Sequence, residues 1–465
     1  MEKNKTALDQ LFGKEDNITL TENGDIAFKE LNNPLLDILF KSEYFRNRLS
    51  EVSIGTSDKE RLFAMFMRDP RYGLGQKNLG RELLKQSGAS FEDVLKCGRA
   101  DDLWMMYHSD SDKFNDVCDY VKSEIEQSGE LSELIKKWCP RFPTHNIVKD
   151  ENGNKVKSPF NDRQQERAVL ARRIATRWGF NKQEYGKFIK ASTVEKDLSL
   201  HEEDNINFEH VPSLASVKYA PTFVRNPKTA ERYKEYIEGV KNGTRKVNVS
   251  VTTVYDIYKN RHNSGFEADL WYSKLPKISG SFLPIVDVSG SMYNSEDSIG
   301  KALSIGYYIS DCSSYCNRQF VTFSCHPQLV SLSDTGLVDN FCKMSKADWG
   351  CNTDLGAVMN LLSDLSEYPE YLVILSDMQF DCGSSQSKNA LRQLWKDKGY
   401  TTKIVWWNFN SRSASCPETD DMGNIFMSGY SPILLQYLES GFDGNQFLEK
   451  LLQVYAQKIG SLSSI

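Results

Sequence analysis

The sequence predicts a helical-repeat (HEAT-like) region followed by a doubly wound α/β domain, and two contrasting patterns support this. The first 276 residues contain mostly amphipathic helical patterns with short polar breaks, and few stretches alternate with period two. After residue 277, short apolar runs alternate with helical patterns, as in a parallel sheet with helices between its strands. We expect an N-terminal extension over 1–30, packed helix pairs over 31–276 and an α/β domain over 277–465.

Helical periodicity in the first region is clearest in a set of separate stretches. Among them are 35–45, 59–66, 79–86, 91–98, 112–127, 164–178 and 228–240. No strict repeat period is visible, so we expect any repeats to be degenerate.

Strand-like apolar runs mark the second region. They span 282–286, 319–324, 371–375, 402–408 and 424–429. The run from Leu372 to Leu375 has no polar interruption, which indicates a strand buried on both faces. Helical patterns fall between or after these runs, at 297–312, 354–366, 387–398, 431–439 and 444–458.

Oxygen-bearing side chains follow the first of these strands in a D-x-S-x-S pattern. Asp287, Ser289 and Ser291 occupy the loop between the strand and the next helix. A carboxylate and two hydroxyls are hard ligands of the kind that Mg²⁺ prefers, and Mg²⁺ commonly keeps open positions for water or a partner. The same residue types also make ordinary turns and N-caps, which is the alternative interpretation.

Two downstream positions favour the metal interpretation. Thr353 precedes a predicted helix, and Asp377 follows the predicted strand 371–375. In a parallel sheet both would lie at the carboxyl edge, where ligands bind in open α/β folds. Asp354 could add charge there, or it could cap the helix that it precedes.

The region from 277 onward resembles a von Willebrand factor A domain with its metal-ion-dependent adhesion site. The five matching residues are Asp287, Ser289, Ser291, Thr353 and Asp377. The resemblance implies that the first three and the threonine contact Mg²⁺ or another divalent cation directly or nearly so. It implies that the aspartate often acts through water. A degenerate copy of the fold that holds no metal is the alternative.

Four segments of the first region resemble viral, fungal and plant proteins of unknown function that carry a C-terminal A-like domain. They are Arg68–Lys77 (RDPRYGLGQK), Gly98–Trp104 (GRADDLW), Lys136–Arg141 (KWCPR within KKWCPR) and Phe208–Ala215 (FEHVPSLA). The same order of segments is similar to the TROVE module of the Ro autoantigen family. That resemblance implies a ring of helical repeats closed by the A-like domain, and binding of small non-coding and misfolded RNAs. Leu74 departs from the family pattern, which usually has Lys or a polar residue there.

These motifs also have structural interpretations. Gly73 and Gly75 could allow a tight turn between helices. Asp101 and Asp102 could place favourable charge at a helix start. Trp138 is a large apolar residue that could belong to the core.

Charge is distributed unevenly along the chain. The net charge is −6 overall, with +2 over residues 1–277 and −8 over residues 278–465. Residues 141–190 carry 12 Lys and Arg against 5 Asp and Glu. We therefore expect RNA phosphates to contact a basic surface, although a solvated helix face is the alternative. The predicted contacts are Arg163, Arg167, Arg172, Arg173, Arg177, Lys182, Lys241, Arg245 and Lys246.

Composition indicates an intracellular protein. The chain begins with polar residues without a signal-peptide pattern, and no run of 18 apolar residues predicts a membrane span. The ten cysteines form no C-x-x-C motif, and reduced thiols in the cytoplasm are the simplest interpretation.

No catalytic motif accompanies these features. The sequence lacks G-x-S-x-G, a Walker A lysine motif and H-E-x-x-H. We therefore expect a non-catalytic RNA-binding scaffold with an Mg²⁺-dependent ligand site. A protein-interaction scaffold, in which a partner's Asp or Glu completes the metal shell without RNA, is the first alternative. A metal-dependent hydrolase is the second alternative.

Overall fold

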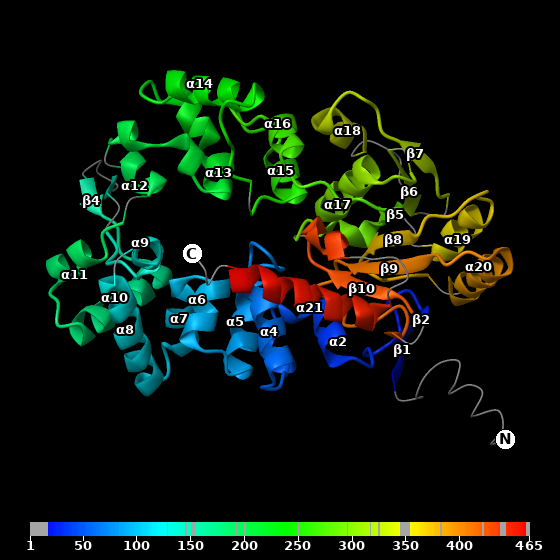
Figure 1. Ribbon diagram of the computed structural model, residues 1–465, viewed down its shortest axis with the longest axis horizontal. Helices are drawn as coiled ribbons and strands as arrows, with labels where there is room; N and C mark the ends of the chain where they lie inside the picture. The colour runs from blue at the N-terminus through cyan, green and yellow to red at the C-terminus, as the bar shows by residue number, and fades with distance from the viewer. Residues whose placement is uncertain are drawn as a thin grey trace.

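The computed structural model describes most of the chain. The described residues are 17–127, 129–144, 147–149, 155–191, 193–199, 201–249, 251–294, 296–316, 318–323, 326–344, 354–381, 384–420, 423–437 and 443–461. They form a helical half, from α2 to α16, and an α/β half, from β5 to α21 (Figure 1). The predicted fold class is confirmed.

Short helices build the helical half, and side-chain caps fix where many of them begin. Ser57, Ser90 and Asn161 each form a capping box with the residue three positions later, at the starts of α4, α6 and α10. The helices are α2 (Pro34–Phe40), α3 (Ser42–Phe45), α4 (Asp58–Arg68), α5 (Lys77–Gln86), α6 (Phe91–Cys97), α7 (Ala100–Tyr107), α8 (Ser111–Glu126), α9 (Glu130–Trp138), α10 (Asp162–Arg177), α11 (Lys182–Phe188), α12 (Val194–Ser199), α13 (Ser213–Arg225), α14 (Ala230–Lys241), α15 (Val254–Asn260) and α16 (Ala268–Ser273).

Each predicted stretch of this half contains a helix, with one correction. The pattern over 35–45 is two helices, because the backbone leaves the helical region at Lys41, where φ is −97° and ψ is 16°. The sequence also did not reveal two small hairpins, β1 (Ile18–Leu20) with β2 (Ile26–Phe28) and β3 (Ile147–Lys149) with β4 (Lys155–Lys157). Strands of three residues are too short for an alternating pattern to show.

One six-stranded sheet forms the centre of the α/β half. Its order is β10-β9-β8-β5-β6-β7, and every neighbouring pair is parallel except β6 with β7. The strands are β5 (Phe282–Asp287), β6 (Gln319–Phe323), β7 (Leu329–Ser331), β8 (Tyr371–Ser376), β9 (Lys403–Asn408) and β10 (Ile425–Ser428). All six residues of β8 are buried, as its apolar sequence predicts. The antiparallel edge strand β7 was not predicted, because it is short and largely exposed.

Helices connect and cover the strands of this sheet. They are α17 (Ser298–Cys312), α18 (Leu337–Met344), α19 (Leu355–Ser363), α20 (Ser384–Lys398) and α21 (Gly444–Ser461). The helix expected over 431–439 is instead a 3₁₀ segment, η7 (Pro432–Tyr437). Helix α17 packs on β5, β6 and β8. Its close approach to β5 depends on Gly306, where a β-carbon would lie 2.5 Å from Cγ2 of Val286.

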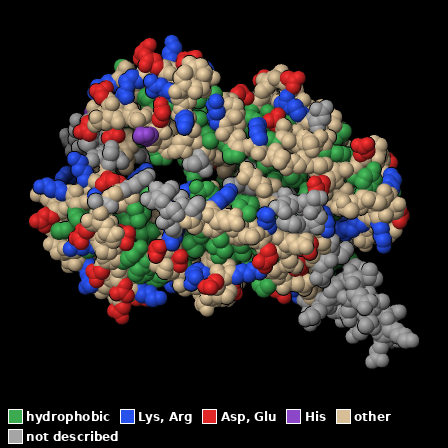
Figure 2. All heavy atoms as spheres, in the orientation of Figure 1, with side chains coloured by type: hydrophobic (Ala, Val, Ile, Leu, Met, Phe, Trp, Pro, Cys, Tyr) green, Lys and Arg blue, Asp and Glu red, His purple; other side chains and the backbone are tan. Residues whose placement is uncertain are grey.

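The helical half contacts the α/β half at both of its ends. Near its start, α2 packs against β10, and α4 packs against α21. Near its end, α15 packs against α17, and α16 packs against α18. The helices between these contacts form an arc (Figure 1), and Figure 2 shows an opening between the two arms of that arc. Among the described residues, no helix is long and apolar enough to cross a membrane.

Candidate functional site

The predicted metal ligands meet where the strand order of the sheet reverses. Asp287 ends β5, and Asp377 directly follows β8, which is the parallel neighbour of β5. Ligands bind at this position in doubly wound sheets, because loops from adjacent strands diverge there. Both carboxylates are buried, with 0% of Asp287 and 5% of Asp377 exposed.

Hydrogen bonds fix the D-x-S-x-S loop around Asp287. The backbone N–H of Ser289 donates to Oδ1 of Asp287 at 2.9 Å, and Oγ of Ser376 donates to Oδ2 at 2.5 Å. The Oγ atoms of Ser289 and Ser291 lie 3.1 Å apart. The structure therefore brings four of the five predicted ligands together. The fifth, Thr353, lies outside the described residues.

Both of these buried carboxyl groups have raised pKa values. Burial and the nearby Asp377 carboxylate raise the pKa of Asp287 to about 7. Burial also raises the pKa of Asp377, and the negative charge of Glu22 adds to that effect. Buried like charges of this kind are relieved when a cation lies between them.

The donor set suits a hard divalent cation. The Asp287 and Asp377 carboxylates and the two serine hydroxyls, which form a hydrogen bond with each other at 3.1 Å, are oxygen ligands of the kind that Mg²⁺ prefers. No cluster of three or more His, Cys, Asp or Glu residues with metal-binding geometry exists among the described residues, so a metal here would depend on hydroxyls. Asp354 is the N-cap of α19, where its Oδ1 accepts from the N–H of Ala357 at 2.9 Å. The capping interpretation of Asp354 therefore agrees with the structure.

The N-terminal hairpin forms part of the rim of this site, which the sequence did not reveal. Its turn is attached to the loop after β8, because the N–H of Glu22 donates to Oε1 of Gln379 at 2.7 Å. The hydroxyl of Thr21 donates to the carbonyl of Phe380 at 2.8 Å. Glu22, Arg412, Ser291 and Asp377 line one small cavity with Gln379 and Asn410. The mouth of the candidate metal site therefore carries one exposed carboxylate and one exposed guanidinium.

Two of the family-like motifs in the helical half meet in a buried ion network, which we define as Arg68, Arg81, Asp101 and Asp102. Asp102 is fully buried, and its carboxylate contacts Arg68 at 2.7 Å and Arg81 at 2.6 Å. Arg81 also contacts Asp101 at 3.1 Å. The segments around 68–77 and 98–104 therefore hold α4, α5 and α7 together, which supports their structural interpretation.

The glycines of the first motif are explained by close packing. A β-carbon on Gly73 would lie 1.9 Å from the carbonyl oxygen of Phe66, and Gly75 has a positive φ of 65°. Leu74, the departure from the family pattern, lies close to Gly429 of the α/β half, where an added β-carbon would be 3.6 Å from Cδ2 of Leu74. The position therefore lies at the junction of the two halves.

The predicted RNA-contacting residues of α10 and α11 divide into two groups. Arg173 lies 3.9 Å above the ring of Phe114, and Arg177 pairs with Asp119 at 2.5 Å. These two arginines already have partners within the protein. In contrast, Arg163, Arg167 and Arg172 are exposed and have neither a carboxylate nor an aromatic partner in the described part of the chain. Lys182 is also exposed and pairs with no carboxylate there, although its ammonium lies beside the Phe142 ring.

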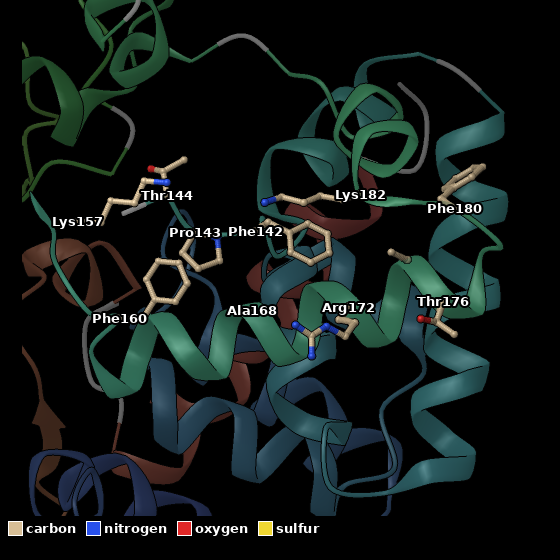
Figure 3. Close-up of a pocket in the computed structure, with 11 residues that line it drawn as sticks. Phe142, Pro143, Thr144, Lys157, Phe160, Ala168, Arg172, Thr176, Phe180 and Lys182 are labelled. Atoms are coloured by element: carbon tan, nitrogen blue, oxygen red, sulfur yellow. The ribbon is translucent and has the colours of Figure 1, made fainter. Parts of the chain in front are cut away.

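Arg172 and Lys182 border a groove of about 620 Å³, which Figure 3 shows in close-up. In that view Phe142 lies between the Lys182 and Arg172 side chains, while Pro143 and Phe160 lie further along α10. The Lys182 ammonium is 5.4 Å from the centre of the Phe142 ring. Exposed Lys157 adds a third cation, and none of the described lining residues is acidic.

In the second predicted basic run, at the end of α14 and after it, Lys241 is the residue with carboxylate partners among the described residues. Lys241 pairs with Glu238 at 3.3 Å and with Glu267 at 3.6 Å. The aliphatic stem of Arg245 lies over Gly239, where a β-carbon would be 2.8 Å from it. Lys246 is exposed. Arg245 is exposed too, and neither it nor Lys246 has a carboxylate partner in the described part of the chain, so this run offers two unpaired cations against four on α10 and α11.

Two family models match parts of the chain. Residues 281–453 match a family described as Domain of unknown function (DUF7788), and residues 115–269 match one described as Domain of unknown function (DUF2828). Neither description names an activity. The first match covers most of the α/β half, and the second covers much of the helical half, including α10 and α11.

One sequence relative and one solved structure are also similar to this chain. An uncharacterized protein of Acanthamoeba polyphaga mimivirus is 26% identical over 377 residues, which are 72% of this chain and 62% of the relative. The crystal structure of the Deinococcus radiodurans Ro (RSR) protein aligns over 95% of this chain and 96% of that chain, with 11% identity and a TM-score of 0.41. The fold assignment depends on the helices and sheet described above and not on this likeness.

Proposed function

We propose that this protein is a non-catalytic RNA-binding scaffold in which the α10–α11 surface contacts RNA phosphates. The observation that carries the proposal is the set of exposed cations, Arg163, Arg167, Arg172 and Lys182, without carboxylate partners among the described residues. Elsewhere in the helical half many cations are paired, as in the buried ion network. Unpaired cations grouped on one element are available to a polyanion. The resemblance of the motifs to the TROVE module favours RNA as that polyanion.

The two ends of α10 offer different surfaces to such a ligand. Arg172 lies nine positions after Arg163, which is about two and a half helical turns, so the two side chains leave opposite sides of α10. Arg163 and Arg167 are one turn apart and share a side. The proposed contact with RNA therefore wraps around α10 and does not follow a single stripe.

The candidate metal site supplies the second part of the proposal. Asp287, Ser289, Ser291, Asp377 and the undescribed Thr353 would hold Mg²⁺, and the ion would then attract an acidic group. Exposed Arg412 at the rim suits a carboxylate from a protein partner, since it can pair with that group's second oxygen. RNA binding and carboxylate binding are separate events at separate surfaces.

RNA binding is tested with the purified full-length chain and a fluorescein-labelled single-stranded RNA of mixed sequence. Fluorescence anisotropy over a series of KCl concentrations gives the affinity and its salt dependence. We expect binding that weakens steeply with salt, and an affinity about 10-fold lower in Arg163→Gln/Arg167→Gln. Lys396→Gln/Lys398→Gln, two exposed lysines at the end of α20, is the charge-matched control and should bind like the wild type.

The result that would overturn the proposal is equally direct. An absence of RNA binding by the wild type at low salt would exclude this function. Binding that both double variants weaken equally would mean that only net charge, and not the α10 surface, attracts the RNA. Release of a protein partner by a chelator but not by ribonuclease would favour the protein-interaction scaffold.

A further inference from the structure

We propose that the groove between α10 and the segment 142–144 binds one unpaired nucleobase, so that the protein selects single-stranded over double-stranded RNA. This inference rests on the proposed function and specifies the kind of RNA. It follows from the side chains that border the groove and not from the overall charge of the surface.

Aromatic and cationic side chains both line this groove. Phe142, Phe160 and Phe180 contribute rings, and Arg172, Lys182 and Lys157 contribute positive charge. The rings of Phe142 and Phe180 are only half-buried, although a purely structural aromatic side chain gains stability from complete burial. Half-buried rings beside cations are how proteins hold single strands, because bases stack on the rings while the cations contact the flanking phosphates.

The Phe142 ring is held in place from one side and remains available from the groove. It packs edge-to-face against Tyr185, with ring centres 5.8 Å apart and an angle of 88°. Tyr185 is fully buried, and its hydroxyl donates to the carbonyl of Pro140 at 2.7 Å. This support fixes the orientation of Phe142 before a ligand binds, which lowers the entropic cost of binding.

The floor of the groove leaves room for a base. Ala168, Ala175 and Thr176 are the α10 residues beside Arg172, and all three side chains are small. A volume of about 620 Å³ exceeds what one base requires and leaves space for its sugar and phosphate. The absence of an acidic residue among the described lining residues favours an anionic occupant.

A duplex could not use this groove in the same way. Its bases are stacked and paired, and reaching the Phe142 ring would require one of them to leave the helix. A duplex can still contact the exposed cations of α10 through its phosphates. The expected behaviour is therefore salt-dependent binding of both forms with a preference for the single strand.

The test compares a single-stranded RNA with a blunt-ended duplex of the same sequence, using the full-length chain. In the single strand, one base is replaced by 2-aminopurine, whose fluorescence falls when it stacks. We expect quenching on binding, and about 10-fold weaker single-strand binding in Phe142→Leu with duplex binding unchanged. Leucine keeps the groove apolar and removes only the aromatic face.

A second variant tests the groove without altering Phe142, whose replacement by leucine could impair folding. Ala168→Leu adds a bulky, non-aromatic side chain to the half-buried floor of the groove and removes nothing from the core, and it supplies no ring on which a base could stack. It should also lower single-strand affinity about 10-fold without changing the melting temperature or duplex binding. Polyglutamate serves as the competitor that represents an acidic protein segment.

The outcomes separate this inference from the proposed function. Equal affinity for single strand and duplex, or no effect of either variant, would overturn the base site while RNA binding by α10 stands. Displacement of single-stranded RNA by polyglutamate as efficiently as by unlabelled RNA would show that charge alone fills the groove, and would also overturn it. No binding of either RNA would defeat both proposals.

Discussion

Arg68 and Arg172 both belong to the helical half, but they differ in burial and in ion pairing. Arg68 is 3% exposed and contacts the fully buried Asp102 at 2.7 Å, within the buried ion network. Arg172 is exposed, has no carboxylate partner among the described residues and borders an aromatic groove. Arg68 lies in the most recognisable motif of the sequence, whereas Arg172 lies in none. A motif that is recognisable in the sequence can therefore contribute to the stability of the fold, as Arg68 does. A candidate binding residue such as Arg172 is identified by its unpaired charge in the folded chain.

Substitution within the buried ion network should reduce stability the most. In Asp102→Ala, the Arg68 guanidinium would remain buried without its counter-charge, which typically costs about 3–5 kcal/mol. Urea unfolding followed by circular dichroism measures this loss. Asp116→Ala, at an exposed position of α8, is the control and should change the free energy of unfolding by about 0.5 kcal/mol or less. An Asp102→Ala protein that unfolds at the wild-type midpoint would show that the network is not structural.

The next effect concerns the exposed side of the comparison. Arg172→Gln/Lys182→Gln removes two unpaired cations from the groove, so RNA affinity should fall about 10-fold while the free energy of unfolding stays within about 0.5 kcal/mol of wild type. Anisotropy and urea unfolding of the same preparation measure both quantities. A variant that loses stability together with affinity would contradict the view that these cations are free for a ligand.

The candidate metal site and the buried ion network both contain buried carboxylates, but only the network contains a buried arginine, Arg68, to neutralise them. Added MgCl₂ should raise the melting temperature of the wild type, and a chelator should reverse the change. Asp287→Asn removes one of two repelling carboxylates, so without metal it should melt roughly 2 °C or more above the wild type, and it should not respond to MgCl₂.

The control for the metal prediction is Asp364→Asn, an exposed carboxylate at the end of α19. It should keep the full response to MgCl₂. A wild-type protein whose melting temperature is unchanged by millimolar MgCl₂, MnCl₂ and CaCl₂ would favour the degenerate copy of the site, which holds no metal.

Arg177 lies on the same helix as Arg172 and should contribute little to RNA binding. Arg177 is exposed like Arg172, but its guanidinium already pairs with Asp119. Arg177→Gln should therefore change RNA affinity by no more than about twofold, because the lost cation was largely neutralised by its partner. Anisotropy under the conditions used for Arg172→Gln provides the measurement, and equal losses in the two single variants would contradict the division of α10 into paired and unpaired cations.

Much of the fold was predictable from the sequence, because long periodic patterns decide it. The buried strand β8 and the paired loops after β5 and β8 follow from apolar runs that end in Asp287 and in Ser376–Asp377. The hairpin β1–β2 was not predictable, because strands of three residues carry no period and its contacts lie more than 350 residues away, as between Thr21 and Phe380. Of the last two predicted metal ligands, Asp377 directly follows β8 as predicted, whereas Thr353 lies outside the described residues.

The candidate RNA surface was predictable only in part. Local density of Lys and Arg identified the stretch from 141 to 190, but it could not separate Arg173 and Arg177 from Arg172. That separation depends on Phe114 and Asp119 of α8, which are neighbours only in the folded chain. The aromatic groove was missed for the same reason, because Phe142, Phe160 and Phe180 are about 20 residues apart and meet through the packing around α10.

The salt dependence of single-stranded RNA binding reports how many phosphates the α10–α11 groove neutralises. Affinities of the wild type and of Arg172→Gln/Lys182→Gln are measured over a series of KCl concentrations, and the slope of log affinity against log salt counts the phosphates neutralised. Loss of two phosphate contacts should make the slope shallower by roughly 1.4. An unchanged slope would mean that RNA does not contact the α10–α11 groove and would contradict this account.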